Sequence, residues 1–281
     1  MNIPLPSIFL SHGSPMIALE PGAAGAFMQR LGPAIEATCG RPRAIVAVSA
    51  HTTAREPVLL AAAQHTAVYD FGNFDPRLKL MRYDAPGDPA LAAHVASLLR
   101  ASQLPVHVLA QGGLDHGIWT ALRYVCPAAD IPVLPLAFVP SQNPMQQFAL
   151  GAALQALRQE GVLVLGTGSI THNLGRVFGG AGMPANDAPE VRESRDFRDW
   201  MHARSSALDW PALLDYRRQA PFAVDMHPSD EHLLPWFVAA GAGGPEGPAL
   251  RLHDSVTMGC VGMDAYAFGA GAPALMAALN A

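Results

Sequence analysis

Three histidines follow short apolar segments, at the points where each segment would leave a sheet. His12 ends "IFLSH", His51 ends "VAVSAH", and His172 follows "VLVLGTGSIT". In open α/β sheets, ligand crevices lie beyond the carboxyl ends of strands, so these three side chains can converge in space. Neutral imidazole is a common ligand for zinc and non-haem iron. Because small residues flank each histidine and leave room for an ion, the pattern favours a metal site over three separate structural histidines.

Two further segments concentrate groups that could complete such a site. His116 lies in "GGLDHGIWT", where its neighbour Asp115 could either cap a helix or orient another imidazole. His227, Glu231 and His232 lie in "HPSDEHLLPWF", at the start of a predicted helix over 229–242 with Ser229 or Asp230 as its N-cap. Adjacent helical residues point about 100° apart, so we expect only one of Glu231 and His232 to bind an ion. The five other histidines have no motif around them and are expected to be structural: His65, His94, His107, His202 and His253.

Other common chemistries lack their sequence signatures. Neither the GxGxxG nor the GxxxxGK[ST] motif occurs, and "SHGSP" lacks the GxSxG frame of a serine hydrolase. The three cysteines are widely separated, which argues against a disulfide framework or a thiolate zinc site. A net charge of −5 argues against a nucleic-acid partner. Without a signal peptide or a long apolar span, we expect no membrane association and a cytoplasmic protein.

Apolar runs that alternate with helix-like segments position these residues. We expect strands at 7–12, 43–51, 57–63, 105–110, 131–138, 161–168, 250–256 and 262–269. Helices are expected at 22–39, 89–102, 117–125, 144–160, 190–206, 210–219 and 229–242, with a polar, aromatic loop at 69–89. The alternation predicts a single α/β domain over 1–281, with a mostly parallel or mixed central sheet covered by helices on both faces.

Several of these segments, in order along about residues 8–268, resemble one enzyme family. They are "FLSHGSPM", "AIVAVSAHTT", "YDFGNF", "GLDHGIWTAL", "ADIPVLPLAF", "GTGSITHNL" and "PSDEHLLPWFVAAGA". Together they resemble the class III extradiol ring-cleavage dioxygenases, a LigB-like family, and most closely its DOPA 4,5-dioxygenase branch. The resemblance implies an α/β fold with one divalent metal ion in a cleft at the sheet edge.

The resemblance also assigns expected roles to the histidines. His12 and His51 match the family's two metal-binding histidines, and His232 matches the third position in this branch. His172 matches the acid–base histidine, which can also be a metal ligand, and His116 matches a histidine that faces the substrate. Relatives that cleave protocatechuate use two histidines and one carboxylate, whereas here Glu231 lies beside His232. An all-histidine set suits Zn(II) at least as well as the Fe(II) expected for catalysis, so the native metal and the third ligand stay open.

The expected activity is insertion of both atoms of O2 into a catechol-type, DOPA-like ring to give a hydroxymuconic semialdehyde. Tyr69, Phe71 and Phe74 are candidate ring contacts, and the candidates for pairing with a substrate carboxylate are Arg55, Lys79 and Arg82. Two alternatives remain: a zinc-dependent hydrolase, or a non-enzymatic binding protein that reuses the metal cleft. The sequence does not choose among catechols and does not indicate an oligomeric state.

Overall fold

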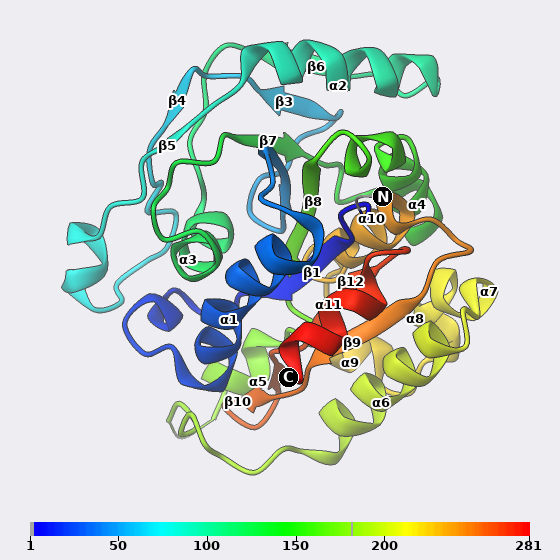
Figure 1. Ribbon diagram of the computed structural model, residues 1–281. Coiled ribbons are helices and arrows are strands. Elements are labelled where there is room, and N and C mark those ends of the chain that lie inside the picture. The colour runs from blue at the N-terminus through cyan, green and yellow to red at the C-terminus, as the bar shows by residue number, and fades with distance from the viewer. Residues whose placement is uncertain (1–2, 181) are drawn as a thin grey trace.

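The protein is built on one eight-stranded mixed sheet, seen in the computed structural model, which describes residues 3–180 and 182–281 (Figure 1). The strand order is β6-β3-β7-β2-β8-β1-β12-β9. The neighbours of β8 (Val162–Gly168), namely β2 (Ala44–Ser49) and β1 (Ser7–Ser11), both run parallel to it. Three adjacent strands at the centre of the sheet therefore end at the same edge.

The other strands either complete this sheet or form two separate two-stranded sheets, β4 with β5 and β10 with β11, and helices cover the main sheet. The remaining strands are β3 (Val58–Leu60), β4 (Gln64–His65), β5 (Ala85–Pro86), β6 (His107–Leu109), β7 (Val133–Ala137), β9 (Ala249–His253), β10 (Val256–Thr257), β11 (Val261–Gly262) and β12 (Ala265–Phe268). The α-helices are α1 (Gly22–Cys39), α2 (Pro89–Ala101), α3 (His116–Val125), α4 (Pro144–Ala152), α5 (Leu174–Phe178), α6 (Arg192–Ser206), α7 (Trp210–Leu214), α8 (Tyr216–Gln219), α9 (Ala223–Met226), α10 (Leu234–Gly243) and α11 (Ala272–Leu279). Short 3-10 helices are η1 (Pro15–Ala18), η2 (Pro76–Leu80) and η3 (Gln155–Arg158).

The central strands are apolar at nearly every position because both of their faces are buried. In β8, Val162 and Val164 belong to one hydrophobic core, while Leu163 and Leu165 belong to the core on the opposite face. Successive side chains in a strand point to opposite faces, so a continuous apolar run fills both cores. Burying a side chain of this kind stabilises the fold by about 1.5–3 kcal/mol.

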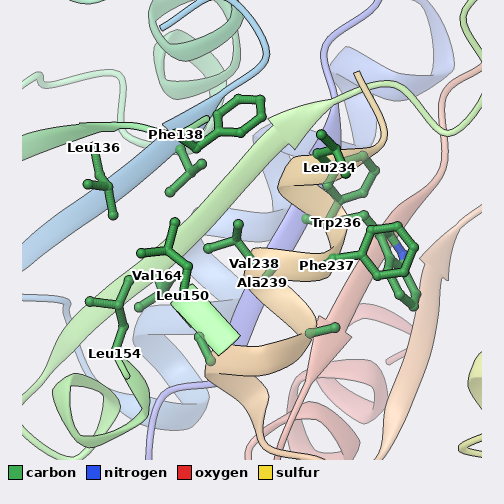
Figure 2. Close-up of a cluster of buried hydrophobic side chains, with 14 of the residues drawn as sticks. Leu136, Phe138, Leu150, Leu154, Val164, Leu234, Trp236, Phe237, Val238 and Ala239 are labelled. Atoms are coloured by element: carbon green, nitrogen blue, oxygen red, sulfur yellow. The ribbon is translucent and has the colours of Figure 1, made fainter. Parts of the chain in front are cut away.

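Helices on each face enclose these two cores. Helices α1, α3 and α11 contribute to one core, and α2, α4, α6 and α10 contribute to the other. Helix α10 is buried along its whole length and packs between the sheet and α4. Figure 2 shows Val238 of α10 beside Val164 of β8 and Leu150 of α4, with Trp236 and Phe237 on the other side of the helix. The predicted single α/β domain with a mixed sheet covered on both faces is confirmed.

Three helix predictions need correction. The segment 210–219 forms two short helices, α7 and α8, which are separated at Asp215. The segment 144–160 forms α4 only as far as Ala152, and residues 155–158 form the separate 3-10 helix η3. The helix predicted from Ser229 begins at Leu234 instead, because its expected capping groups have other partners. The hydroxyl of Ser229 donates to Glu231, and the Asp230 carboxylate accepts from Tyr216 and Arg217. Glu231 and His232 therefore lie in a turn before the helix.

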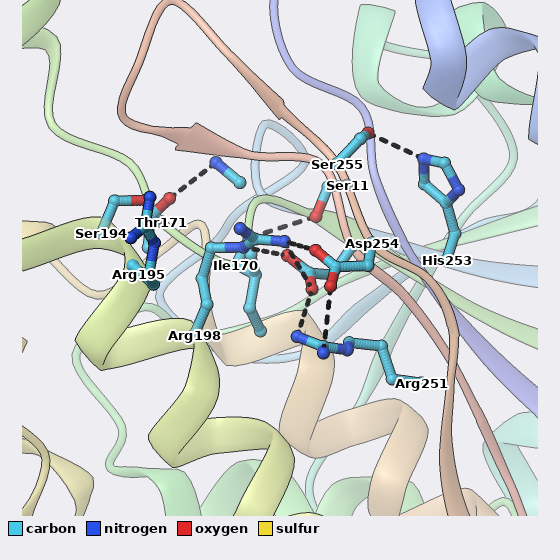
Figure 3. A network of polar contacts seen from close by, with 12 residues as sticks. Ser11, Ile170, Thr171, Ser194, Arg195, Arg198, Arg251, His253, Asp254 and Ser255 are labelled. Atoms are coloured by element: carbon cyan, nitrogen blue, oxygen red, sulfur yellow. Dashed lines mark hydrogen bonds and ion pairs between the residues drawn. The ribbon is translucent and has the colours of Figure 1, made fainter. Parts of the chain in front are cut away.

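A buried ion network fastens α6 to the late strands (Figure 3). Arg198, which is 4% exposed, donates to Asp264 at 2.7 Å and to Glu190 at 2.8 Å, and it also pairs with Asp254. Asp264 is fully buried and is also 3.4 Å from Arg251. The backbone oxygen of Asp264 accepts from the N–H of Ser11, the residue before His12. The network thus supports the end of β1 from which His12 projects.

Membrane insertion through a helix is not supported by the described part of the chain. Within residues 3–180 and 182–281, none of the helices has both the length and the apolar character that a bilayer crossing requires.

Candidate metal centre

His12 and His51 face each other at the carboxyl edge of the sheet. His12 directly follows β1 and is fully buried, and His51 lies two residues beyond the end of β2 with 24% of its side chain exposed. Their Nε2 atoms are 3.1 Å apart. The sequence-based expectation that strand ends would bring these two histidines together is borne out by this geometry.

The hydrogen bonds around His12 assign its tautomer. The single hydroxyl proton of Thr167, in β8, is donated to the carbonyl oxygen of Gly117 at 2.9 Å. The Thr167 oxygen, 2.9 Å from Nδ1 of His12, must therefore accept a proton from that nitrogen. A neutral His12 with its proton on Nδ1 presents a lone pair at Nε2, which is the nitrogen that faces His51.

His116 is oriented by Asp70 in the same way. Nδ1 of His116 lies 3.1 Å from an Asp70 carboxylate oxygen, which also accepts from the His116 backbone N–H at 2.9 Å. Burial favours the neutral form of Asp70, but the hydrogen bonds and charge of His116 lower the pKa of its carboxyl. Nδ1 of His51 lies 3.8 Å from the other Asp70 oxygen, so one carboxylate serves two imidazoles. This leaves Nε2 of His116 free to face the centre of the site.

Asp115 does not orient an imidazole. Its carboxylate caps helix α3 by accepting from the Ile118 N–H, and it also accepts from the hydroxyls of Ser49 and Thr52. Of the two interpretations that the sequence left open, the helix cap is confirmed. Asp115 acts on the site indirectly, because it ties the start of α3 to the end of β2.

His232 is held by its neighbour Glu231 and by the end of β8. Nδ1 of His232 lies 3.0 Å from a Glu231 oxygen, and this hydrogen bond lowers the pKa of Glu231 to about 2. The His232 carbonyl accepts from the N–H of Ser169 at 2.9 Å. A Cβ at Gly168 would lie 2.0 Å from that carbonyl, so only glycine allows the turn to approach the strand this closely. Glu231 thus hydrogen-bonds His232 at Nδ1 and leaves Nε2 available.

His172 lies flat against His232. The two ring centroids are 3.5 Å apart and the planes differ by 11°. The His172 backbone N–H donates to the Met226 carbonyl at 2.9 Å, which fixes the loop after β8. Burial, followed by the proximity of His232, lowers the pKa of His172 to about 3, so its imidazole is neutral at physiological pH.

The five histidines His12, His51, His116, His172 and His232 form one cluster, and we call them the histidine cluster. Nitrogens of His12, His51 and His116 lie within 4.8 Å of one another, as do ligand atoms of His172, Glu231 and His232. The two groups adjoin, with ring centroids of His232 4.9 Å from His51 and 5.7 Å from His12. His227, by contrast, is buried outside this cluster and hydrogen-bonds the Ile170 carbonyl.

The donor set fits a divalent metal ion. Burial and the neighbouring imidazoles lower the pKa of His12 well below its usual value and that of His51 to about 3, so both are neutral. Nε2 of His12 and Nε2 of His51 lie 3.1 Å apart, close enough for one ion to bind both nitrogens. Carboxylates or a hydroxyl at Nδ1, with Nε2 free, form the arrangement typical of metal-binding histidines.

A largely apolar cavity of about 430 Å³ opens onto the cluster. Its walls include His51, His116, His172 and His232, together with Phe71 and Phe74 as the sequence analysis expected. Tyr69 is not part of this lining, since its hydroxyl donates to the Met81 carbonyl. Arg55, Lys79 and Arg82 do not line it either, and Arg55 borders a separate hollow with Glu56 and His107.

Two residues that orient the imidazoles are not among the residues predicted from the sequence. Asp70 holds His116, and Thr167 holds His12. Asp70 lies inside the aromatic "YDFGNF" segment, and Thr167 lies inside a buried strand. A polar residue in each of these apolar settings is the signal that could have found them.

Comparison with known proteins decides the family. The model of the catalytic LigB subunit of aromatic ring-opening dioxygenase matches residues 6–269. The chain belongs to this family. It is 32% identical over 269 residues to the 4,5-DOPA dioxygenase extradiol of Beta vulgaris, covering 93% of this chain and 96% of that protein.

Other LigB relatives agree with this membership. The chain is 32% identical over 263 residues to the 4,5-DOPA dioxygenase extradiol of Escherichia coli strain K12, covering 92% and 93% of the two chains. The crystal structure of the uncharacterized protein JW3007 from Escherichia coli K12 superposes with a TM-score of 0.72 at 28% identity. That match covers 94% of this chain and all of the other. The predicted LigB resemblance and α/β architecture are thereby confirmed.

Proposed function

We propose that this LigB-family protein is a metal-dependent extradiol dioxygenase that inserts both atoms of O2 into a catechol-type ring. The product would be a hydroxymuconic semialdehyde, formed by opening the ring next to the diol. The observation that carries the proposal is the pre-oriented histidine cluster at the base of an apolar cavity. The names of the relatives make DOPA one member of the catechol class to test.

His12, His51 and His232 are the proposed metal ligands. Each has a partner at or near Nδ1, namely Thr167, Asp70 and Glu231 respectively, so that Nε2 is the nitrogen proposed to bind the ion. Fe(II) is the proposed catalytic metal, and an all-nitrogen set also binds Zn(II) well. When bound, such an ion would supply the Lewis acidity that lowers the pKa of a catechol hydroxyl and the redox chemistry that O2 requires.

His172 is the proposed acid–base. It is neutral, lines the cavity and lies flat on His232, so its ring stands beside a proposed ligand. A neutral imidazole in this place can accept the proton of a catechol hydroxyl and later return it to the product. Its low pKa makes it a modest base by itself, so transfer depends on the acidity of the bound hydroxyl.

His116 is the proposed hydrogen-bonding partner of the substrate. Because its Nδ1 proton is donated to Asp70, its Nε2 can accept a hydrogen bond from a ring hydroxyl. The ring of Phe71 stands perpendicular to His116 with centroids 5.6 Å apart. Phe71 thereby limits where an aromatic substrate can lie and helps to exclude water from the reacting atoms.

Oxygen uptake tests the proposal directly. Protein stripped of metal and reconstituted anaerobically with Fe(II) should consume one O2 per catechol, with a yellow ring-opened product in equal amount. The panel contains catechol, 4-alkylcatechols, carboxylated catechols and DOPA, and protein loaded with Zn(II) serves as the control without oxygen chemistry. If the Fe(II)-loaded protein consumes no O2 with any catechol, the proposal fails and a zinc hydrolase or a binding protein becomes the better assignment.

A further inference from the structure

Exposed apolar side chains gather at the mouth of the cavity. Phe74 is 36% exposed, Leu174 52%, Phe178 56% and Met183 59%, and all four line the opening. We call these four the mouth residues. They come from two separate segments, the loop that carries Phe71 and the region of α5, so the apolar rim is formed from two sides. Large apolar side chains that surround a pocket mark a surface that binds apolar groups.

The cavity offers no cation to a substrate anion. Among the residues that the structure describes, those that line it include neither lysine nor arginine. Arg176 stands on α5 between two mouth residues, but its guanidinium is held in ion pairs with Asp225 and Glu193. The one basic side chain of this helix is therefore already neutralised.

Carboxylates border the cavity instead. Asp70 and Glu231 hydrogen-bond the cluster histidines from behind. Glu20 and Asp187 line an adjoining hollow of about 320 Å³, which shares Ser14 and Met258 with the cavity. A negatively charged substituent that reaches past the ring to the mouth would leave water for an apolar rim that offers no lysine or arginine, which is unfavourable.

From these observations we infer that the preferred substrates are catechols with an uncharged, apolar substituent, which the mouth residues contact, rather than carboxylated catechols. This inference rests on the proposed dioxygenase function and specifies its substrate class. Each buried CH2 group of such a substituent strengthens binding by a factor of about four. A propyl chain, with three such carbons, therefore favours 4-propylcatechol over catechol itself by up to about 60-fold.

A matched pair of substrates tests the inference. The compounds 4-propylcatechol and 3-(3,4-dihydroxyphenyl)propionate have nearly the same shape and differ in a terminal methyl or carboxylate. With the Fe(II)-loaded protein, kcat/KM should be at least about tenfold higher for 4-propylcatechol. An equal or higher value for the carboxylated compound overturns the inference. A preference for 4-(2-aminoethyl)catechol over both also overturns it and would point to Glu20 and Asp187.

Substitutions at the mouth provide an independent readout. Phe178→Lys replaces an exposed apolar side chain with a cation, so the ratio of the two kcat/KM values should fall at least about fivefold. Leu174→Lys should act in the same direction. Met145→Lys is the matched control, because Met145 is 62% exposed but lies on α4 outside the cavity, and it should leave the ratio unchanged. An unchanged ratio in both mouth variants overturns the inference.

Calorimetric binding separates failure of this inference from failure of the proposed function. Metal-free protein is titrated with the same two compounds, so the readout does not depend on turnover. Tighter binding of 4-propylcatechol without any oxygen uptake would contradict the dioxygenase proposal but support the apolar site. Oxygen uptake with a preference for the carboxylated compound would support the dioxygenase proposal but contradict the preference for apolar substituents.

Discussion

Nε2 of His12 lies 3.1 Å from Nε2 of His51, although the two residues end different strands. The hydroxyl oxygen of Thr167 accepts a hydrogen bond from Nδ1 of His12, so the lone pair of His12 is at Nε2, and Asp70 lies 3.8 Å from Nδ1 of His51. Together with His116, these two side chains place ligand atoms within 4.8 Å of one another, a spacing that one ion can bridge. Metal content is therefore the most direct property to measure.

His12→Ala and His51→Ala should each abolish stable metal binding. Removing one of two facing nitrogens leaves too few ligands for a divalent ion, so metal after reconstitution and desalting should fall below about a tenth of wild type. Elemental analysis measures this, with circular dichroism to confirm folding. His94→Ala is the control, since His94 is exposed on α2 and pairs with Glu160. Full occupancy in both cluster variants would remove these residues from the ligand set.

The third ligand is decided by comparing His232→Ala with His116→Ala. We expect His232→Ala to weaken metal affinity by at least about 100-fold, whereas His116→Ala should change it by about tenfold or less and mainly lower turnover. Competition with a calibrated chelator gives both affinities. The reverse order would assign His116, whose nitrogens also lie within 4.8 Å of those of His12 and His51, as the ligand.

His172→Ala should keep its metal and lose turnover. If His172 transfers the catechol proton, kcat should fall by about 10²- to 10⁴-fold, with a much smaller change in KM. Steady-state oxygen uptake measures both constants, and elemental analysis is run on the same samples. Loss of metal in parallel with activity would instead make His172 a ligand, and unchanged kcat would exclude it from proton transfer.

The sequence predicted the parts of the fold whose signal is local. The apolar runs that end at His12 and His51 form β1 and β2. A strand buried on both faces is apolar at nearly every position whichever strands lie beside it, so the run itself predicts the strand. The start of α10 was predicted wrongly because it depends on contacts between residues that are distant in the sequence. Ser229 and Asp230 are residue types that commonly cap helices, but the Asp230 carboxylate accepts a hydrogen bond from Tyr216 instead.

The same distinction applies to the site. The cluster histidines could be predicted because strand ends converge and because the motifs resemble a known family. Asp70 and Thr167 stand out in the sequence as polar residues in apolar segments, but the imidazoles that they orient could not be predicted, since those contacts span 46 and 155 residues of chain. The mouth residues could not be predicted either, because Leu174 and Phe178 line the cavity only where the fold brings α5 and the loop that carries Phe74 to the same opening.

Arg198→Met should destabilise the protein by about 3 kcal/mol. It would leave the fully buried Asp264 with a more distant pairing to Arg251, and breaking a buried ion pair leaves an uncompensated charge. Urea unfolding of the metal-free protein measures the free energy of unfolding. Arg192→Met is the control on the same helix, because its pair with Asp196 is 82% exposed on the arginine side and should be worth less than about 1 kcal/mol. Equal effects of the two substitutions would contradict a structural role for the network.

Acid should destabilise the metal-free protein through His227. Burial lowers the pKa of His227 to about 4, while the unfolded chain has an ordinary value near 6.5. Between these values the unfolded state binds a proton that the folded state does not, so stability present above pH 6.5 is lost as the pH falls toward 4. For this residue alone the loss from pH 7 to pH 5 is about 2 kcal/mol. His12, His51 and His172, whose pKa values are also lowered by burial, add losses of the same sign. Urea unfolding at the two pH values measures the total.

His227→Gln is the control, because glutamine keeps a donor for the Ile170 carbonyl but does not titrate. The free energy of unfolding that this variant loses between pH 7 and pH 5 should be smaller than the wild-type loss by the contribution of His227. An identical loss in both proteins would contradict the assignment.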